Sequence, residues 1–123
     1  AVVIVGSKNV PAPGPGAAAY SAAKAGLTQL ARVAALELAP HSIRVNTVHP
    51  NAVFDTAIWT EEVLAGRAAH YGLTVGEYKT SNLLAQEVRS KDVAAMVCAM
   101  AGPDFSRTTG AQVPVDGGTE RIV

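Results

Sequence analysis

A tyrosine and a lysine stand four residues apart, at Tyr20 and Lys24, near the start of a long apolar run. On a helix this spacing places both side chains on one face, one turn apart. A phenol has an ordinary pKa of about 10, and an ammonium group held nearby favours the phenolate and lowers that pKa. The pair therefore predicts a phenol suited to proton transfer, with a half-buried tyrosine beside a solvated lysine as the alternative.

Two further features favour the chemical interpretation of this pair. Ser7 lies thirteen residues before Tyr20, at the end of the apolar run 1–5, and a second β-type run closes at Pro50. Ligands of open α/β sheets bind beyond the carboxyl ends of the strands. We therefore expect Ser7, the Tyr20–Lys24 pair and Pro50 to lie at one edge of a sheet.

The apolar and β-branched runs predict a regular alternation of strands and helices. Pro40 should stop the long helix, Ser90 should cap a later one, and Pro114 should confine the last strand to an edge. The expected strands are 1–6, 42–48 and 111–115, and the expected helices are 18–39, 60–71, 75–84 and 90–101.

The composition of the 123 residues, 49% hydrophobic with a formal net charge of zero, suits one globular unit. It gives no reason to expect nucleic acid or a membrane surface as a partner. The lone cysteine, Cys98, excludes an internal disulfide, is expected to be buried in a helix, and favours a reducing, cytoplasmic location. The three histidines show no metal-ligand spacing, so no metal is expected.

The ordered set of motifs resembles the C-terminal half of a short-chain dehydrogenase/reductase. The matching residues are Ser7, Tyr20 with Lys24, Arg44-Val45-Asn46, Pro50-Asn51 and Val115-Asp116-Gly117-Gly118. The resemblance implies an α/β fold, the C-terminal half of a Rossmann-like doubly wound parallel sheet with three parallel strands and covering helices. The segments 10–16 and 70–75 are also similar to the dehydrogenase part of bifunctional rhamnulose-phosphate aldolase/alcohol dehydrogenase proteins.

The resemblance implies hydride transfer between a nicotinamide, NAD or NADP, and a small carbonyl or alcohol substrate. Ser7 would bind the substrate oxygen, Tyr20 would contact both substrate and cofactor and exchange the proton, and Lys24 would hold the ribose hydroxyls. Trp59 would contact substrate within a lid at 57–84. The further cofactor-binding residues would be Pro50, Asn51, Ala52, Val53 and Thr56.

Two residues depart from the family pattern, and the family's adenosine-binding half has no counterpart in residues 1–123. Asn51 replaces the usual glycine, and Asp55 stands where threonine is common.

We expect residues 1–123 to be a single partial domain, a fragment that is inactive alone and binds no NAD(P). The alternative is a non-catalytic interaction module built on the same half-fold. The helix 18–39 is apolar nearly all round, which predicts a homo-oligomer.

Overall fold

The computed structural model describes residues 1–119 as one three-stranded sheet with helices on both faces. The elements in chain order are β1 (Val2–Val5), α1 (Ala18–Leu38), a 3₁₀ turn (Ala39–His41), β2 (Val45–Pro50), α2 (Glu61–His70), α3 (Val75–Lys79), α4 (Ser90–Ala101), a second 3₁₀ turn (Pro103–Phe105) and β3 (Gln112–Val115).

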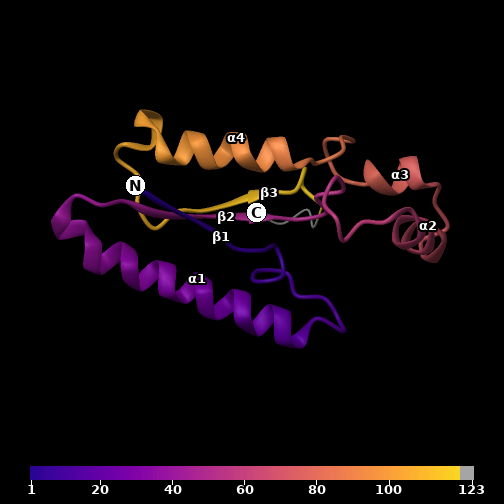
Figure 1. The fold of residues 1–123 in the computed structure, drawn as a ribbon, viewed down its shortest axis with the longest axis horizontal. Coiled ribbons are helices and arrows are strands. Elements are labelled where there is room, and N and C mark those ends of the chain that lie inside the picture. Colours follow the sequence, from indigo (N-terminus) through magenta and orange to yellow (C-terminus); the bar gives the residue numbers. More distant parts are fainter. Residues whose placement is uncertain (120–123) are drawn as a thin grey trace.

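The sheet has the order β1-β2-β3, and both pairs of strands are parallel. The predicted fold class is confirmed, and β3 is an edge strand as Pro114 predicted. Figure 1 shows α1 on one face of the sheet and α4 on the other, with α2 and α3 beyond the carboxyl ends of the strands. This arrangement leaves those ends facing the loops that carry the predicted site.

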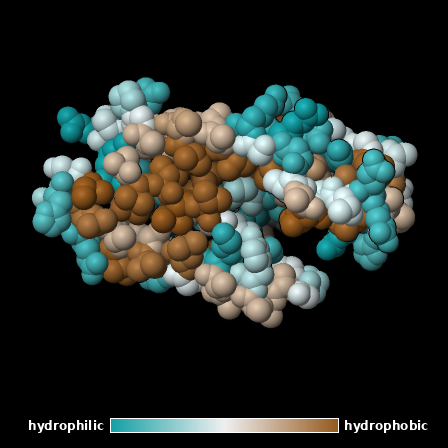
Figure 2. All heavy atoms as spheres, in the orientation of Figure 1, coloured by the Kyte–Doolittle hydropathy of each residue, from teal (hydrophilic) through white to brown (hydrophobic). Residues whose placement is uncertain are grey.

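Helix α1 packs on the sheet through small residues, Thr28, Ala31 and Ala35. Ala31 and Ala35 form a core cluster with Val45 of β2. The opposite side stays exposed, since Leu36 keeps 77% of its accessible surface. Figure 2 shows hydrophobic atoms gathered over the region where Figure 1 draws β1, α1 and α4.

Among residues 1–119, no helix is both long and apolar enough to cross a bilayer.

The structure corrects the predicted start of the second strand. β2 begins at Val45 rather than at residue 42, because Ser42 adopts a left-handed conformation (φ 58°) that turns the chain after α1. β2 also extends through Pro50, whose carbonyl oxygen accepts a hydrogen bond from the Lys8 N–H at 3.0 Å. A proline can end a strand in this way because its carbonyl still accepts.

Helix α3 ends at Lys79 rather than at residue 84. The hydroxyl of Thr80 donates to the Gly76 carbonyl at 3.0 Å, and that of Ser81 donates to the Tyr78 carbonyl at 2.7 Å. Hydroxyls close to the backbone compete with the helical hydrogen-bond pattern in this way. The helix therefore stops after little more than one turn.

Two predictions about α4 were wrong. Arg89, not Ser90, is its N-cap, and Ser90 is the first helical residue. Cys98 lies in the helix but is exposed. Met100, the buried residue of α4, is two positions along, and two helical steps rotate a side chain by about 200° to the far side of the helix.

The Arg44-Val45-Asn46 segment connects β2 to the end of α4 and to the turn before β3. The Arg44 guanidinium donates to the Met100 carbonyl at 2.9 Å and the Ala101 carbonyl at 3.1 Å, where a cation favours the helix C-terminus. The Asn46 amide donates to the Thr108 carbonyl and accepts from the Ala111 N–H, both at 2.9 Å. Asn46 is thus a structural hydrogen-bonding residue that joins β2 to the turn before β3.

Gly6, directly after β1, has no space for a side chain, because side chains of β2 lie against its Cα. A Cβ added there would lie 2.6 Å from His49 Nδ1 and 3.0 Å from Thr47 Cγ2. We expect Gly6→Ala to lower the free energy of unfolding of the full-length parent protein by about 1–3 kcal/mol, because the β2 side chains must shift. Gly26→Ala is the matched control, since a Cβ there meets no atom within 4 Å. In helix α1 it should be neutral or stabilise by about 0.5–1 kcal/mol. Urea unfolding of both variants tests this, and equal stabilities would contradict it.

Candidate functional site

Ser7 lies just beyond β1, where its side chain is buried with 6% exposure. The Asn9 N–H donates to Ser7 Oγ at 3.2 Å. This contact uses the oxygen as an acceptor, so the hydroxyl hydrogen can still donate. Ser7 is thus a hydroxyl at the carboxyl end of a parallel strand, with its oxygen position set by the chain that follows.

Tyr20 and Lys24 lie one turn apart on α1, as their spacing predicted, and both belong to the same edge. Lys24 Nζ donates to the Val5 carbonyl at 3.0 Å, which ties the ammonium to β1 two residues before Ser7. The same nitrogen lies 5.9 Å from the centre of the Tyr20 ring, within the range of a cation–π contact. The Tyr20 side chain is 50% exposed, so it can reach a ligand.

A buried ion pair that sequence reasoning missed lies directly beside Ser7. Lys8 Nζ is 2.9 Å from Asp116 Oδ2, and both side chains are almost fully buried. The other carboxylate oxygen of Asp116 accepts from the Gly118 N–H at 2.8 Å. The pair therefore joins the turn after β3 to the residue that follows Ser7. Removing one partner of such a pair leaves a buried charge uncompensated, which is strongly destabilising.

The predicted cofactor loop follows β2 and is bonded to the end of β3. Asn51 N–H donates to the Val115 carbonyl at 3.2 Å, and Thr56 Oγ1 donates to the Val53 carbonyl at 2.8 Å. Ala52 has a φ of 51°, in the left-handed region that favours glycine. The loop thus places its conformational strain at the residue after Asn51, next to the position where glycine is usual.

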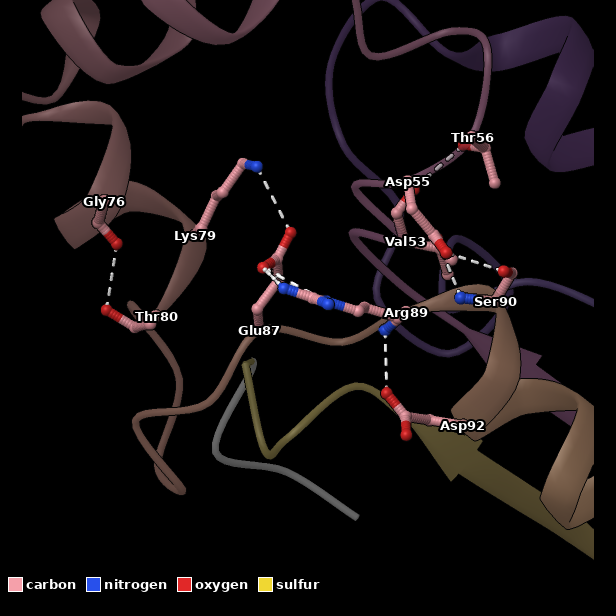
Figure 3. A network of polar contacts seen from close by, with 10 residues as sticks. All are labelled: Val53, Asp55, Thr56, Gly76, Lys79, Thr80, Glu87, Arg89, Ser90 and Asp92. Carbon is pink, nitrogen blue, oxygen red and sulfur yellow. Dashed lines mark hydrogen bonds and ion pairs between the residues drawn. The ribbon is translucent and has the colours of Figure 1, made fainter.

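Asp55, the second departure from the family pattern, contacts the start of α4. Its carboxylate accepts from the Ser90 N–H at 2.7 Å and from the Ser90 hydroxyl at 2.6 Å, as Figure 3 shows. These hydrogen bonds from Ser90 lower the pKa of the Asp55 carboxyl below its ordinary value. The negative charge therefore stabilises the N-terminus of a helix.

A second carboxylate, Glu87, joins α3 to the segment before α4 (Figure 3). Its two oxygens lie 3.2 Å from Lys79 Nζ and 2.8 Å from an Arg89 guanidinium nitrogen. The hydrogen bond from Arg89 is the main cause that lowers the pKa of Glu87, with a smaller contribution from Lys79. The Arg89 N–H donates to Asp92 in the first turn of α4 at 2.8 Å. These contacts link the predicted lid to α4.

Trp59 belongs to an aromatic cluster between the loop after β2 and the two lid helices. Its ring centre lies 5.0 Å from that of Phe54, which is buried, and 6.4 Å from that of Tyr78. Tyr71 stacks on Tyr78 at 5.9 Å. Burial raises the pKa of Tyr78. The cluster joins α2 and α3 to the loop, so the predicted lid has a small core of its own.

A groove of about 770 Å³ lies where residues 80–92 face the end of β3. Its lining includes Leu83, Val88, Met96 and Pro114, and none of Ser7, Tyr20 or Lys24. The predicted site is therefore an open edge of the sheet rather than this groove. Within residues 1–119, no group of three or more metal-binding side chains is placed to hold a metal ion.

Comparisons with known proteins assign the family. Residues 1–120 match the family model described as enoyl-(acyl carrier protein) reductase. The relatives and structural neighbours include short-chain dehydrogenases and oxidoreductases, and the chain belongs to the short-chain dehydrogenase/reductase family. Its three parallel strands with flanking helices agree with the Rossmann fold of these neighbours.

Three similar proteins show how much of a relative the chain spans. An uncharacterized oxidoreductase, YuxG of Bacillus subtilis, is 38% identical over 95% of this chain and 18% of its own length. The (-)-trans-carveol dehydrogenase of Rhodococcus erythropolis is 36% identical over 81% of this chain and 38% of its own length. An NADPH-bound short-chain oxidoreductase from Pseudomonas aeruginosa, described as having an atypical catalytic center, is 29% identical with a TM-score of 0.80. It matches 98% of this chain and 46% of its own, so the chain spans less than half of each protein.

The Asp55–Ser90 contact predicts a dependence of stability on acid. Because the folded pKa of Asp55 lies below the ordinary value of about 4, this contact stabilises the fold above that value and is lost as the pH falls through the folded pKa. We expect Asp55→Asn to destabilise the parent protein near neutral pH and to reduce the further loss on acidification. Urea unfolding between about pH 7 and about pH 3 measures both effects.

Asp104→Asn, at an exposed carboxylate in the second 3₁₀ turn, is the control and should leave the acid dependence unchanged. An Asp55→Asn variant whose stability follows the wild type at every pH would contradict the role given to Asp55.

Proposed function

We propose that the parent protein of this chain oxidises a secondary alcohol, or reduces the corresponding carbonyl, through Ser7, Tyr20 and Lys24. The observation that carries the proposal is the contact between the two segments that hold these residues: Lys24 of α1, one turn after Tyr20, is bonded at 3.0 Å to the Val5 carbonyl of β1, two residues before Ser7. Membership of a family of oxidoreductases supports the same reaction class. The carveol dehydrogenase relative supports an alcohol or carbonyl as the substrate class.

In the direction of alcohol oxidation, the substrate oxygen accepts a hydrogen bond from the Ser7 hydroxyl. The Tyr20 side-chain oxygen takes the proton from that oxygen, with the Lys24 ammonium 5.9 Å from the centre of the Tyr20 ring. A nicotinamide, when bound, supplies the acceptor for the hydride that leaves the carbinol carbon. Carbonyl reduction is the reverse, with Tyr20 returning its proton to the substrate oxygen. Trp59 would line the substrate side of the site from the lid at 57–84.

The chain's own groups fit a nicotinamide ribose. The Lys24 ammonium has three hydrogens, and the Val5 carbonyl takes one of them. The others can donate to ribose hydroxyls beside the half-exposed Tyr20. The backbone of Pro50 to Val53, with Thr56, would face the carboxamide of the nicotinamide. The Asp55 carboxylate is hydrogen-bonded to Ser90 at the start of α4. The choice between NAD and NADP stays open.

We also propose that residues 1–123 form only part of a domain. β1 is an edge strand of the described sheet, and its Val5 side chain is 47% exposed, which supports further chain or another subunit covering this side. The chain spans only 18% of YuxG and 38% of the carveol dehydrogenase, which supports a longer parent. The proposal that this parent is a bifunctional aldolase/alcohol dehydrogenase rests on the sequence resemblance of segments 10–16 and 70–75. A homo-oligomer and a cytoplasmic location stay predictions.

The first test removes the exchangeable proton. We expect Tyr20→Phe to lower kcat of the full-length parent by a factor on the order of 10² or more, while cofactor affinity changes little. The assay follows reduced nicotinamide with NAD⁺ or NADP⁺ and (-)-trans-carveol, cyclopentanol or 2-butanol. Tyr71→Phe, in the aromatic cluster, is the matched control and should keep its turnover. Unchanged turnover in Tyr20→Phe would make Tyr20 structural. A parent that binds neither cofactor and oxidises no alcohol would favour the interaction module.

The second test concerns residues 1–123 alone. Association costs several kcal/mol of translational and rotational freedom, and a few hydrogen bonds of about 1 kcal/mol each do not offset it. The residues proposed here supply nicotinamide contacts, whereas pyrophosphate is bound at a glycine-rich turn opening a helix. We therefore expect no measurable heat of NAD or NADP binding and no dehydrogenase activity. A low-micromolar dissociation constant in titration calorimetry would contradict this.

A further inference from the structure

The His49 side chain connects the third strand to Ser7. His49 lies near the end of β2 and is 4% exposed. Its Nδ1 is 3.1 Å from the Ser7 backbone nitrogen, and its Nε2 is 2.6 Å from Gln112 Oε1 on β3. The Ser7 carbonyl oxygen lies 2.9 Å from the same Nδ1. Both polar atoms of the Ser7 backbone therefore face one ring nitrogen.

The hydrogen-bond partners favour one tautomer of the His49 ring. Because an amide oxygen can only accept, the contact with Gln112 Oε1 favours the tautomer in which Nε2 carries the hydrogen and donates it, whereas the other tautomer would donate from Nδ1 to the Ser7 carbonyl oxygen at 2.9 Å. Nδ1 of the neutral ring is then an acceptor, and it takes the Ser7 N–H. The Gln112 contact on β3 thereby determines which group of Ser7 the ring can bind.

The Ser7 N–H depends on this ring because the sheet does not use it. On either side, the Gly6 N–H donates to the Val48 carbonyl at 2.8 Å and the Lys8 N–H donates to the Pro50 carbonyl at 3.0 Å. The Ser7 N–H between them donates to His49 instead. The ring lies so close to the chain here that a Cβ on Gly6 would be 2.6 Å from Nδ1. His49 is therefore the partner of the Ser7 N–H, between two residues whose N–H groups the sheet itself holds.

We propose that His49 is a positioning residue for Ser7 in hydride transfer, an inference that rests on the proposed function. It fixes the Ser7 backbone so that the hydroxyl meets the substrate oxygen, and it does not touch the substrate itself. A misplaced hydrogen-bond donor loses much of its effect on the transition state, so loss of the Nδ1 contact should lower kcat.

Two amide variants separate the ring nitrogens. His49→Asn can place its amide oxygen near the position of Nδ1 and accept from the Ser7 N–H. His49→Gln reaches toward Gln112 and leaves that N–H without its acceptor. In the full-length parent, with the most active alcohol of the panel above, we expect His49→Gln to lose about tenfold or more in kcat and His49→Asn to stay within about threefold of wild type. Cofactor affinity, measured by nicotinamide fluorescence, should be unchanged in both.

Ser7→Ala distinguishes failure of this inference from failure of the proposed function. If His49 acts through Ser7, the double variant Ser7→Ala/His49→Gln turns over no more slowly than Ser7→Ala alone. A slow Ser7→Ala beside a fully active His49→Gln would overturn the role of His49 and leave the proposed reaction standing. An unaffected Ser7→Ala would overturn the proposed mechanism itself. Equal losses in His49→Asn and His49→Gln would reduce His49 to a structural residue.

Two further measurements do not depend on His49→Gln folding or on a substrate. Gln112→Met removes the acceptor that orients the ring and should lower kcat in the same direction, so wild-type turnover would count against the inference. Nitrogen-15 spectra of the parent should show His49 protonated at Nε2, with the Ser7 amide resonance shifted in His49→Gln more than in His49→Asn. Protonation at Nδ1 would overturn the assignment.

Discussion

The central strand, β2, is the element on which the rest of the described structure depends. Five of its six residues are buried, and it bonds to a parallel neighbour on each side. Asn46 and His49 are buried polar side chains of this strand, and such groups destabilise a fold unless they are hydrogen-bonded. Asn46 binds the turn before β3, and His49 binds the chain after β1. The hydrogen bonds that satisfy the buried polar side chains of β2 thus hold the turn before β3 and the chain after β1.

The carboxyl edge of the sheet is organised by contacts to backbone oxygens and by one buried ion pair. The Lys24 ammonium donates a hydrogen bond to the Val5 carbonyl, and the Lys8 ammonium forms an ion pair with Asp116. A buried or half-buried ammonium needs such acceptors because its desolvation is costly. Each contact ties a different element to the chain around Ser7. The proposed chemistry therefore depends on groups whose positions are set mainly by charge and hydrogen bonding rather than by apolar packing.

The loop after β2 accommodates its two unusual residues in different ways. After Asn51, the positive φ that glycine would adopt freely falls on Ala52, at a cost of about 1–2 kcal/mol. Asp55 binds Ser90, where its charge stabilises the start of α4. A carboxylate that the resemblance would place near a dinucleotide is thus engaged in joining two elements. The same loop carries Phe54 into the aromatic cluster that holds the lid helices.

Local patterns in the sequence determined the strands, the helices, the parallel order and the Tyr20–Lys24 face. Each of these follows from spacing along one segment or from short β-branched runs separated by a helix. The early end of α3 also has a local cause, since the hydroxyls of Thr80 and Ser81 bond to carbonyls four and three residues before them. The tertiary structure decided the exposure of Cys98 and the contacts of Asp55, because these depend on which faces pack together. It also decided the two bonds of the His49 ring, which join residues 42 and 63 positions apart. No local spacing encodes such contacts, since they exist only once three strands lie side by side.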